Sequence, residues 1–350
     1  MTVLGMEVLP RALPAVAPDE APLWRQCLRG FSQCAFQCNE LTALAFIAAA
    51  GVYDWRMMIF YVISVILGTL TARLLGGDRV LLGLGLFGFN SGLMGLALGN
   101  FFVHDTALWV AVPILACIVG AVTVAAARWL PIPFLAAPFI AAFWVIWPIR
   151  SAVGLTAVNL GAFGESRVNF FLGTLHALGS TLFAVSAATG ILFLLGVLVA
   201  NWRQGIVAIL GGLVAVLLAA HVGAPGDMIN SGFIGFNAVL AALATYELVA
   251  ADLRLAFLAA ITATWFFSFI NRNWPSPALA SGFVLTVWLI MLLGWLNPRF
   301  SRGAAAGEPE LESEPEAKAA QPAVPPLPGP RTPAPPGGVA SRGQRVDPPQ

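Results

Sequence analysis

The sequence predicts an all-α polytopic membrane protein with two inverted repeats. Each repeat has five transmembrane helices and one re-entrant half-helix, which gives about ten spans. Hydrophobic residues make up 59% of the chain and charged residues 10%, whereas soluble domains carry about 25% charge. Apolar stretches recur from about residue 41 to about residue 297, and a bilayer-spanning helix needs roughly 20 such residues. The short alternating segments of a membrane β-barrel are absent from the sequence.

The third observation is an internal repeat. The segment GLFGFNSGLMGLAL (85–98) is echoed by SGFIGFNAVLAAL (231–243), and Asn237 follows Asn90 by 147 residues (237 − 90 = 147). Further pairs keep this offset in order along the chain, and the offset falls to 144 near the end of each half, where Phe283 matches Phe139 (283 − 139 = 144). A run of matched pairs in order predicts a duplicated membrane unit.

Four regions follow from this pattern. Residues 1–21 contain several prolines and are expected to form a flexible N-terminal tail. Residues 22–150 form the first membrane repeat and 151–300 the second, inverted repeat. Residues 301–350 are rich in proline, alanine and charge, so they cannot bury enough apolar surface to fold and are expected to be a disordered tail.

In the first repeat the segment 26–39 is too short and too polar to cross a bilayer, and it is expected to be re-entrant. Its counterpart in the second repeat is 171–184, and further spans follow to about 297. Five spans per half is an odd number, so the second half enters the membrane inverted, as in folds that place a pathway near the bilayer midplane. The expected spans of the first repeat are 40–54, 57–75, 80–100, 106–128 and 131–149.

Arginines give the orientation. With a cytoplasmic N-terminus, most arginines fall on the inner side, as the positive-inside rule requires. The sequence therefore predicts a multi-pass protein of the inner or plasma membrane with both termini in the cytoplasm. The predicted inner group is Arg25, Arg29, Arg73, Arg79, Arg128, Arg203, Arg254, Arg299 and Arg302, and the outer group is Arg56, Arg150, Arg167 and Arg272.

Gln33 is the main candidate for a solute contact. An amide in an apolar segment is costly unless it is hydrogen bonded or lines a wet cavity. Phe36 follows one helical turn later on the same face, and an amide acceptor beside an aromatic plane suits a small, flat, uncharged polar solute. The alternative is a structural glutamine with satisfied hydrogen bonds. Asn90 and Asn237 are expected to tether the ends of the two re-entrant half-helices, with simple helix–helix contact as the alternative.

Other functions lack the residues they need. The acidic residues lie at predicted loops except Glu40, beside the re-entrant segment, so the mid-span carboxylate typical of ion-coupled transport is missing. No nucleophile–base pair, phosphate loop or metal-binding helix motif occurs, and the clustered cysteines are interpreted as small hydrophobic residues rather than metal ligands. An enzyme, a cofactor, a metal and a nucleic-acid partner are therefore not expected; the formal net charge is +1.

Three segments resemble the urea transporter family, in particular its bacterial-type channels: LRGFSQCAFQCNELTAL (28–44), GLFGFNSGLMGLAL (85–98) and LPIPFLAAPFIAAFWV (130–145). The resemblance covers roughly 25–297. It implies a homotrimer in the bilayer, with a pore between the inverted halves of each protomer. In this family a slot lined by oxygen acceptors and clamped by aromatic rings passes urea. The matching positions are Gln33 and Phe36 with its repeat partner Phe183, and the wall residues Phe89, Leu93, Phe236 and Leu240.

The chain departs from the family pattern at three acceptor positions. Ser180 stands where the second re-entrant helix of the family usually has Glu or Gln, and Ala136 and Ala280 stand where it usually has Thr. The acceptors are thus reduced to Gln33, Ser180 and backbone carbonyls. The predicted function is passive, channel-type transport of urea or a urea-like small neutral solute. The alternatives are a divergent homologue that passes ammonia, an amide or water, an ion-coupled secondary transporter, and a membrane-embedded enzyme.

Overall fold

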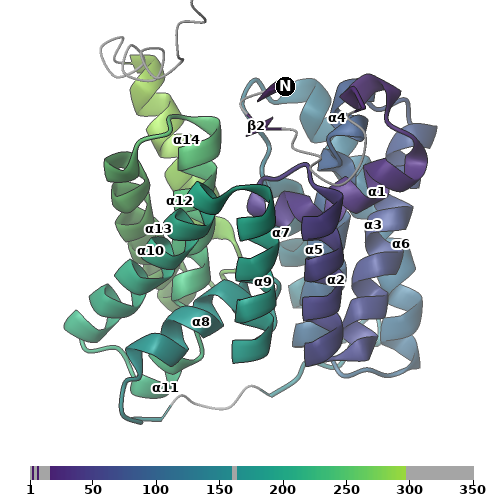
Figure 1. The fold of residues 1–350 in the computed structure, drawn as a ribbon. Helices are drawn as coiled ribbons and strands as arrows, with labels where there is room; N and C mark the ends of the chain where they lie inside the picture. The colour runs from purple at the N-terminus through teal and green to yellow at the C-terminus, as the bar shows by residue number, and fades with distance from the viewer. Residues whose placement is uncertain (1, 4–5, 8–15, 160–163, 297–350) are drawn as a thin grey trace, which may run out of the picture. The chain divides into compact units, whose positions relative to one another are not determined.

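The computed structural model describes residues 2–3, 6–7, 16–159 and 164–296. These residues belong to one unit, Met1–Glu308, and the tail predicted at 301–350 lies outside the described residues. Two short strands, β1 (Thr2–Val3) and β2 (Met6–Glu7), pair antiparallel with Thr2 opposite Glu7. All other regular structure in the described residues is helical (Figure 1).

The first half begins with a broken helix and continues with longer ones. A 3-10 turn precedes it, and the chain bends between the second 3-10 turn and α2. The elements are η1 (Pro18–Glu20), α1 (Leu23–Ser32), η2 (Gln33–Ala35), α2 (Glu40–Tyr53), α3 (Trp55–Leu74), α4 (Arg79–Gly83), α5 (Leu86–Phe101), α6 (Thr106–Trp129) and α7 (Ala137–Ile149).

The second half repeats these bounds. Both ends of α2, α3 and α4 recur 147 residues later in α9, α10 and α11, and the closing helix starts 144 residues later (281 − 137 = 144). The duplication is therefore present in the helix bounds as well as in the sequence. The elements are α8 (Phe170–Ser180), α9 (Ala187–Ala200), α10 (Trp202–His221), α11 (Gly226–Asn230), α12 (Gly235–Leu248), α13 (Leu253–Asn273) and α14 (Ser281–Leu296).

Two hydrogen bonds set the direction of α2 against α9, which lie side by side (Figure 1). The hydroxyl of Thr42, at the start of α2, donates to the carbonyl of Gly196, near the end of α9, at 2.8 Å. The hydroxyl of Thr189, at the start of α9, donates to the carbonyl of Ala49, near the end of α2, at 3.3 Å. The start of each helix therefore lies beside the end of the other, so α2 and α9 run antiparallel.

A second reciprocal pair joins the closing helices. The indole N–H of Trp144 donates to the carbonyl of Pro277 at 2.9 Å, and that of Trp288 donates to the carbonyl of Pro133 at 2.8 Å. Trp288 is the repeat partner of Trp144, and Pro133 is the repeat partner of Pro277, so the same contact is made in both directions between the halves. Reciprocal contacts of this kind are the mark of a two-fold rotation. The two halves therefore pack with approximate two-fold symmetry.

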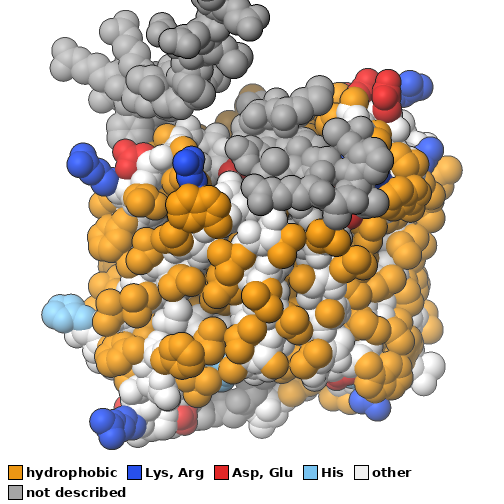
Figure 2. All heavy atoms as spheres, viewed as in Figure 1, with side chains coloured by type: hydrophobic (Ala, Val, Ile, Leu, Met, Phe, Trp, Pro, Cys, Tyr) orange, Lys and Arg blue, Asp and Glu red, His pale blue; other side chains and the backbone are white. Residues whose placement is uncertain are grey.

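Four described helices are long and apolar enough to cross a membrane, namely α3, α6, α10 and α13. The segment Leu23–Ala35 with Glu40–Tyr53, bent by 71°, could form a fifth span. Figure 2 shows hydrophobic side chains across the middle of one face and charged side chains at its two ends, as expected for a protein in a bilayer. The structure thus supports a multi-pass membrane protein, with fewer full-length spans than the ten predicted.

One predicted span is broken where another backbone approaches closely. The span expected at 80–100 is divided at Gly85, whose φ is 82°. A Cβ atom there would lie 2.3 Å from the backbone nitrogen of Gly30, so α1 packs directly against this break. The end of the expected N-terminal tail is also more ordered than predicted, because η1 packs on α4 and a Cβ at Gly83 would lie 1.6 Å from the carbonyl oxygen of Pro18.

Candidate functional site

The two segments predicted to be re-entrant, which we call the re-entrant segments, end in strained turns. Phe36 follows η2 and Phe183 follows α8, and both have a φ of 57°. This left-handed conformation is unfavourable for residues other than glycine and persists only where the surroundings hold it. The same strained conformation at equivalent positions (183 − 36 = 147) places one aromatic ring at the tip of each segment.

Each of these rings crosses to the closing helix of the other half. The Phe36 ring lies 6.0 Å from that of Phe283 at 64°, and the Phe183 ring lies 6.0 Å from that of Phe139 at 79°, both edge-to-face. Such pairs contribute beyond the burial of their area. The tips of the re-entrant segments and the starts of α7 and α14 therefore meet at the boundary between the halves.

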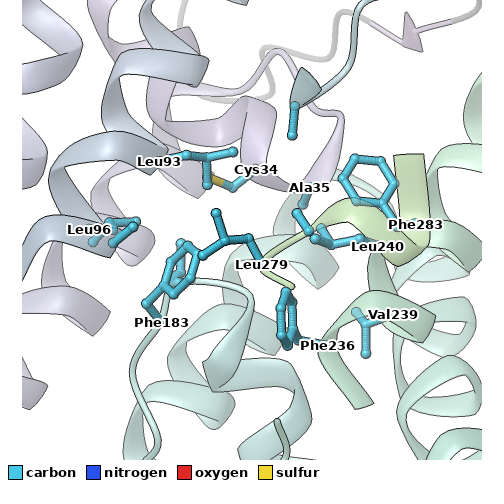
Figure 3. Close-up of a cluster of buried hydrophobic side chains, with 14 of the residues drawn as sticks. Cys34, Ala35, Leu93, Leu96, Phe183, Phe236, Val239, Leu240, Leu279 and Phe283 are labelled. Atoms are coloured by element: carbon cyan, nitrogen blue, oxygen red, sulfur yellow. The ribbon is translucent and has the colours of Figure 1, made fainter. Parts of the chain in front are cut away.

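The Gly-Phe-Asn helices, α5 and α12, form the walls of this region. Phe89 and Leu93 on α5, and Phe236 and Leu240 on α12, are all buried in one cluster with Phe36 and Phe183. Figure 3 shows side chains from both halves gathered here, including Leu93, Phe183, Phe236, Leu240 and Phe283. The structure brings together the aromatic and aliphatic residues that the sequence singled out.

Gln33 adds a polar group to this apolar region. Its side-chain nitrogen donates to the carbonyl of Leu84 at 2.7 Å and to the sulfur of Cys38 at 3.1 Å. Its side-chain oxygen is buried and has no hydrogen-bond partner among the described residues. A buried oxygen left unpaired costs about 1–3 kcal/mol, so this amide oxygen is an acceptor with unused hydrogen-bonding capacity among the described residues.

Gln33 lines a cavity of about 450 Å³, which we call the first mouth. Phe36 and Phe89 lie on its wall, and nearly all the other lining residues are apolar. A mostly apolar pocket with one well-placed polar group is typical of small-molecule sites. The remaining lining residues are Leu81, Leu86, Ala127, Leu130, Ile132, Pro133, Phe134, Leu135, Leu248 and Met291.

Ser180 occupies the position of Gln33 in the second half and makes the equivalent bond. Its hydroxyl donates to the carbonyl of Ser231 at 3.3 Å, and Ser231 is the repeat partner of Leu84 (231 − 84 = 147). The Ser180 hydroxyl therefore donates to the backbone carbonyl as the Gln33 amide group does. The lone pairs of the hydroxyl oxygen can still accept a hydrogen bond. Because the side chain is shorter, that oxygen stays close to the backbone it binds.

Ala136 and Ala280 directly precede the closing helices and are buried. Ala136 is the N-cap residue of α7, and its methyl group cannot accept a hydrogen bond. The first-turn N–H groups of a helix need acceptors from elsewhere when the cap residue cannot supply one. The two alanines therefore add no acceptor to the slot through their side chains.

Asn90 and Asn237 supply that missing cap, which corrects the predicted role. They were expected to tether the re-entrant half-helices, but their hydrogen bonds go to the closing helices. Asn90 accepts from the backbone N–H of Phe139 at 3.1 Å and donates to the carbonyl of Leu135 at 2.9 Å. Asn237 repeats this with Phe283 at 2.9 Å and Leu279 at 2.9 Å. The closing helix starts without a side-chain cap, so the nearby Asn90 amide bonds to it instead of to the expected partner, the re-entrant half-helix.

Asn90→Leu is expected to destabilise the protein, because it leaves the Leu135 carbonyl and the Phe139 N–H buried and unpaired, at about 1–3 kcal/mol for each group. Asn237→Leu should have a similar effect through Leu279 and Phe283. Thermal unfolding in detergent measures both. Asn90→Asp keeps an acceptor for Phe139 but loses the amide donor to Leu135 and buries a carboxyl group, so it should also unfold below the wild-type temperature. Unfolding of Asn90→Leu at the wild-type temperature would contradict the capping role.

A buried polar network joins the two halves, and no motif in the sequence indicated it. Gln37 donates to the side-chain oxygen of Gln204 at 2.7 Å and accepts from Thr42 at 3.0 Å, and Gln204 donates to Glu247. Glu247 was expected at a solvated loop, but it lies in α12 and is half-buried. Its partner lies 43 residues away in the chain, so no local sequence pattern could have identified the contact.

Glu40 is a buried carboxylate that pairs with two buried arginines. Its carboxylate lies 3.3 Å from the Nε atom of Arg29 and 3.6 Å from that of Arg25. Both arginines are buried in α1 and were counted as loop charges in the sequence. The ion pairs hold the start of α2 against α1, and α1 leads directly into the turn that begins at Gln33.

The chain matches a family described as urea transporter over residues 24–295. It is 25% identical over 300 residues to urea transporter 1 of Rattus norvegicus, which covers 79% of this chain and 78% of that protein. It is 23% identical over 304 residues to urea transporter 1 of Ovis aries, with 77% of each chain covered. The family match spans both halves and every residue of the site described above.

Proposed function

The chain belongs to the urea transporter family, and we propose that it passes urea, or a urea-like small neutral solute, passively between its two halves. The observation that carries this proposal is the side-chain oxygen of Gln33. It is buried and has no partner among the described residues, and Gln33 shares its cavity with Phe36 and Phe89. Urea is flat and rich in N–H donors, so it can bond to this oxygen while its faces lie against aromatic rings.

The carboxylates near the site are already engaged by other side chains, which is consistent with passive transport. Coupling to an ion needs a carboxylate or histidine that can bind and release it. Glu40 lies between the buried arginines Arg25 and Arg29, and Glu247 accepts a hydrogen bond from Gln204. A coupling ion would have to compete with these contacts, so an ion-coupled transporter is not favoured.

Stopped-flow measurements on proteoliposomes test the function. We expect urea flux that rises in proportion to concentration at moderate levels and is unchanged by a proton or sodium gradient, because no charged group is moved. Liposomes without protein are the control, and ammonia, acetamide and water complete the solute panel. Accumulation of urea above equilibrium would contradict a channel, and flux of another panel member without urea flux would favour a divergent homologue.

We further propose that the two halves cross the membrane in opposite senses, with five spans in each. The antiparallel packing of α2 and α9 supports this, because equivalent helices point in opposite directions. The shorter apolar helices would complete the ten spans together with the four long ones. The placement in the inner or plasma membrane with cytoplasmic termini, and the homotrimer implied by the family motifs, belong to the same proposal.

Cysteine labelling from one side of the membrane tests the inversion. Arg56→Cys and Arg203→Cys place a thiol at equivalent exposed positions (203 − 56 = 147) at the starts of α3 and α10. We expect a membrane-impermeant reagent to label them from opposite sides. The background should lack Cys27 and Cys117, which are partly exposed. Labelling of both from one side would rule out inverted halves.

A further inference from the structure

The repeat gives a second set of residues, equivalent to those that line the first mouth and drawn from both halves, and its side chains differ. Three residues that line the first mouth are Leu86, Leu248 and Met291. Their repeat partners are Phe233 (233 − 86 = 147), Phe101 (248 − 101 = 147) and Trp147 (291 − 147 = 144). Aromatic rings thus stand at the positions equivalent to these aliphatic side chains of the first mouth, and we call the region around Phe101, Trp147 and Phe233 the second mouth.

These rings contact one another around Phe101. The centroid of its ring lies 6.0 Å from that of Trp147 at 81° and 6.4 Å from that of Phe233 at 87°. Phe143 of α7 lies 5.5 Å from Phe101 at 61° and stacks on Trp147 at 5.7 Å. Phe101 is buried, so the group is a packed cluster and not a set of separate surface rings.

The cluster adjoins the slot directly. The ring of Phe101 lies 6.2 Å from that of Phe183, at the tip of the second re-entrant segment, and the ring of Phe233 lies 5.9 Å from that of Phe236. Phe183 and Phe236 are the repeat partners of Phe36 and Phe89, which line the first mouth. A solute that passes Phe183 toward the second mouth therefore meets Phe101 next.

The replacement is not uniform around the second mouth. Phe134 of the first mouth corresponds to Ala278 (278 − 134 = 144), and Gln33 corresponds to Ser180. The added rings come from α5, α7, the segment before α12, and Trp274 directly after α13, which is the repeat partner of Leu130 (274 − 130 = 144). Phe101, Trp147 and Phe233 lie in one cluster that also contacts Phe183, whereas Trp274 pairs with Trp144 at 5.2 Å.

We propose that Phe101, with Phe233 and Trp147, forms an aromatic constriction that limits the size of the solutes passing the second mouth. The inference rests on the proposed function and specifies the selectivity of that pathway. A solute wider than urea must separate more of these edge-to-face contacts than urea does. Parting one such pair slows passage about two- to tenfold, so N-methylurea is expected to pass more slowly than urea in the unaltered protein.

Phe101→Leu tests the constriction, because leucine is the residue that this protein has at the equivalent position, Leu248. Stopped-flow flux of urea and N-methylurea is measured in proteoliposomes of the full chain. We expect the ratio of N-methylurea flux to urea flux to rise about two- to tenfold. The reverse change, Leu248→Phe at the first mouth, should lower the ratio. Phe46→Leu removes a buried ring that stacks on Phe193 and contacts no ring of this cluster, so it should leave the ratio unchanged.

The outcomes separate the two proposals. If the unaltered protein passes no urea, the proposed function is wrong and the constriction with it. If it passes urea and the ratio in Phe101→Leu stays at the unaltered value, only the constriction is overturned. Where Phe101→Leu fails to fold, Phe233→Leu decides, because its ring contacts both Phe101 and Phe236 and its repeat partner is Leu86.

Discussion

Gln33→Leu is expected to lower urea flux by about 10- to 100-fold in protein that folds and reaches the membrane normally. Urea gives up hydrogen bonds to water in a dry slot, and each uncompensated group costs roughly 1–3 kcal/mol. Each 1.4 kcal/mol added to a barrier slows a rate about tenfold. Leucine has a similar size and removes both the acceptor and the amide donor that positions it on Leu84.

Ser180→Ala is the matched variant in the second half. It removes the hydroxyl at the equivalent position, where the hydrogen bond to Ser231 is 3.3 Å, whereas Gln33 bonds to Leu84 at 2.7 Å. The shorter side chain extends less far from its backbone, so we expect a smaller loss of urea flux than from Gln33→Leu. Proteoliposome flux with equal protein content measures both. Wild-type urea flux in Gln33→Leu would show that this glutamine is structural.

The repeat in the sequence predicted the duplicated order of helices, and the family resemblance supplied the residues expected between the halves. The offset of 147 found in Asn90 and Asn237 recurs in both ends of α2 and α3 with their partners. Composition and repetition are properties of the whole chain, and they remain readable without coordinates. The contacts of Phe36 and Phe183 across the two halves follow from the same symmetry.

The partners of buried polar groups were not predictable in the same way. The sequence indicates that Asn90 needs a hydrogen-bond partner in an apolar helix, but several helix ends could provide one. The bond to Leu135 joins residues 45 positions apart, and packing selects it because α7 starts without a side-chain cap at Ala136. The bonds of Trp144 and Trp288 to proline carbonyls were missed for the same reason.

The difference between the mouths was present in the sequence but had no meaning without the structure. Aligning the halves places Phe101 opposite Leu248 and Trp147 opposite Met291. Substitutions between repeats are common, and most only change local packing. Leu248 and Met291 line the cavity that also contains Gln33, and the ring contacts of Phe101 are the basis of the constriction proposed above.

The second large effect is expected at Glu40. Glu40→Ala should lower the free energy of unfolding by about 3–5 kcal/mol, the usual cost of breaking a buried ion pair by removing one partner. The Arg29 side chain is 0% exposed and the Glu40 side chain 4% exposed, with 3.3 Å between Nε and the carboxylate. Removal of the carboxylate leaves the Arg29 guanidinium buried without its counter-charge.

The consequence should extend from stability to transport, because Arg29 also donates to the carbonyl of Gly83 at 2.8 Å. Arg29 therefore joins α1 to α4, and α1 continues directly into the turn that carries Gln33. If the Arg29 side chain moves to reach water, this turn moves with it. We expect urea flux in Glu40→Ala to fall even at temperatures where the protein remains folded.

Thermal unfolding in detergent, read alongside urea flux, measures both effects. Glu40→Gln keeps the size and an acceptor but removes the charge, so it should fall between wild type and Glu40→Ala. Arg29→Met combined with Glu40→Leu removes both charges, and replacing a buried ion pair by apolar residues is often neutral. The double variant should therefore recover stability relative to Glu40→Ala, and the difference gives the coupling energy. If Glu40→Ala unfolds at the wild-type temperature, the charge on Arg29 is balanced by other groups and the ion pair does not hold α1 in place.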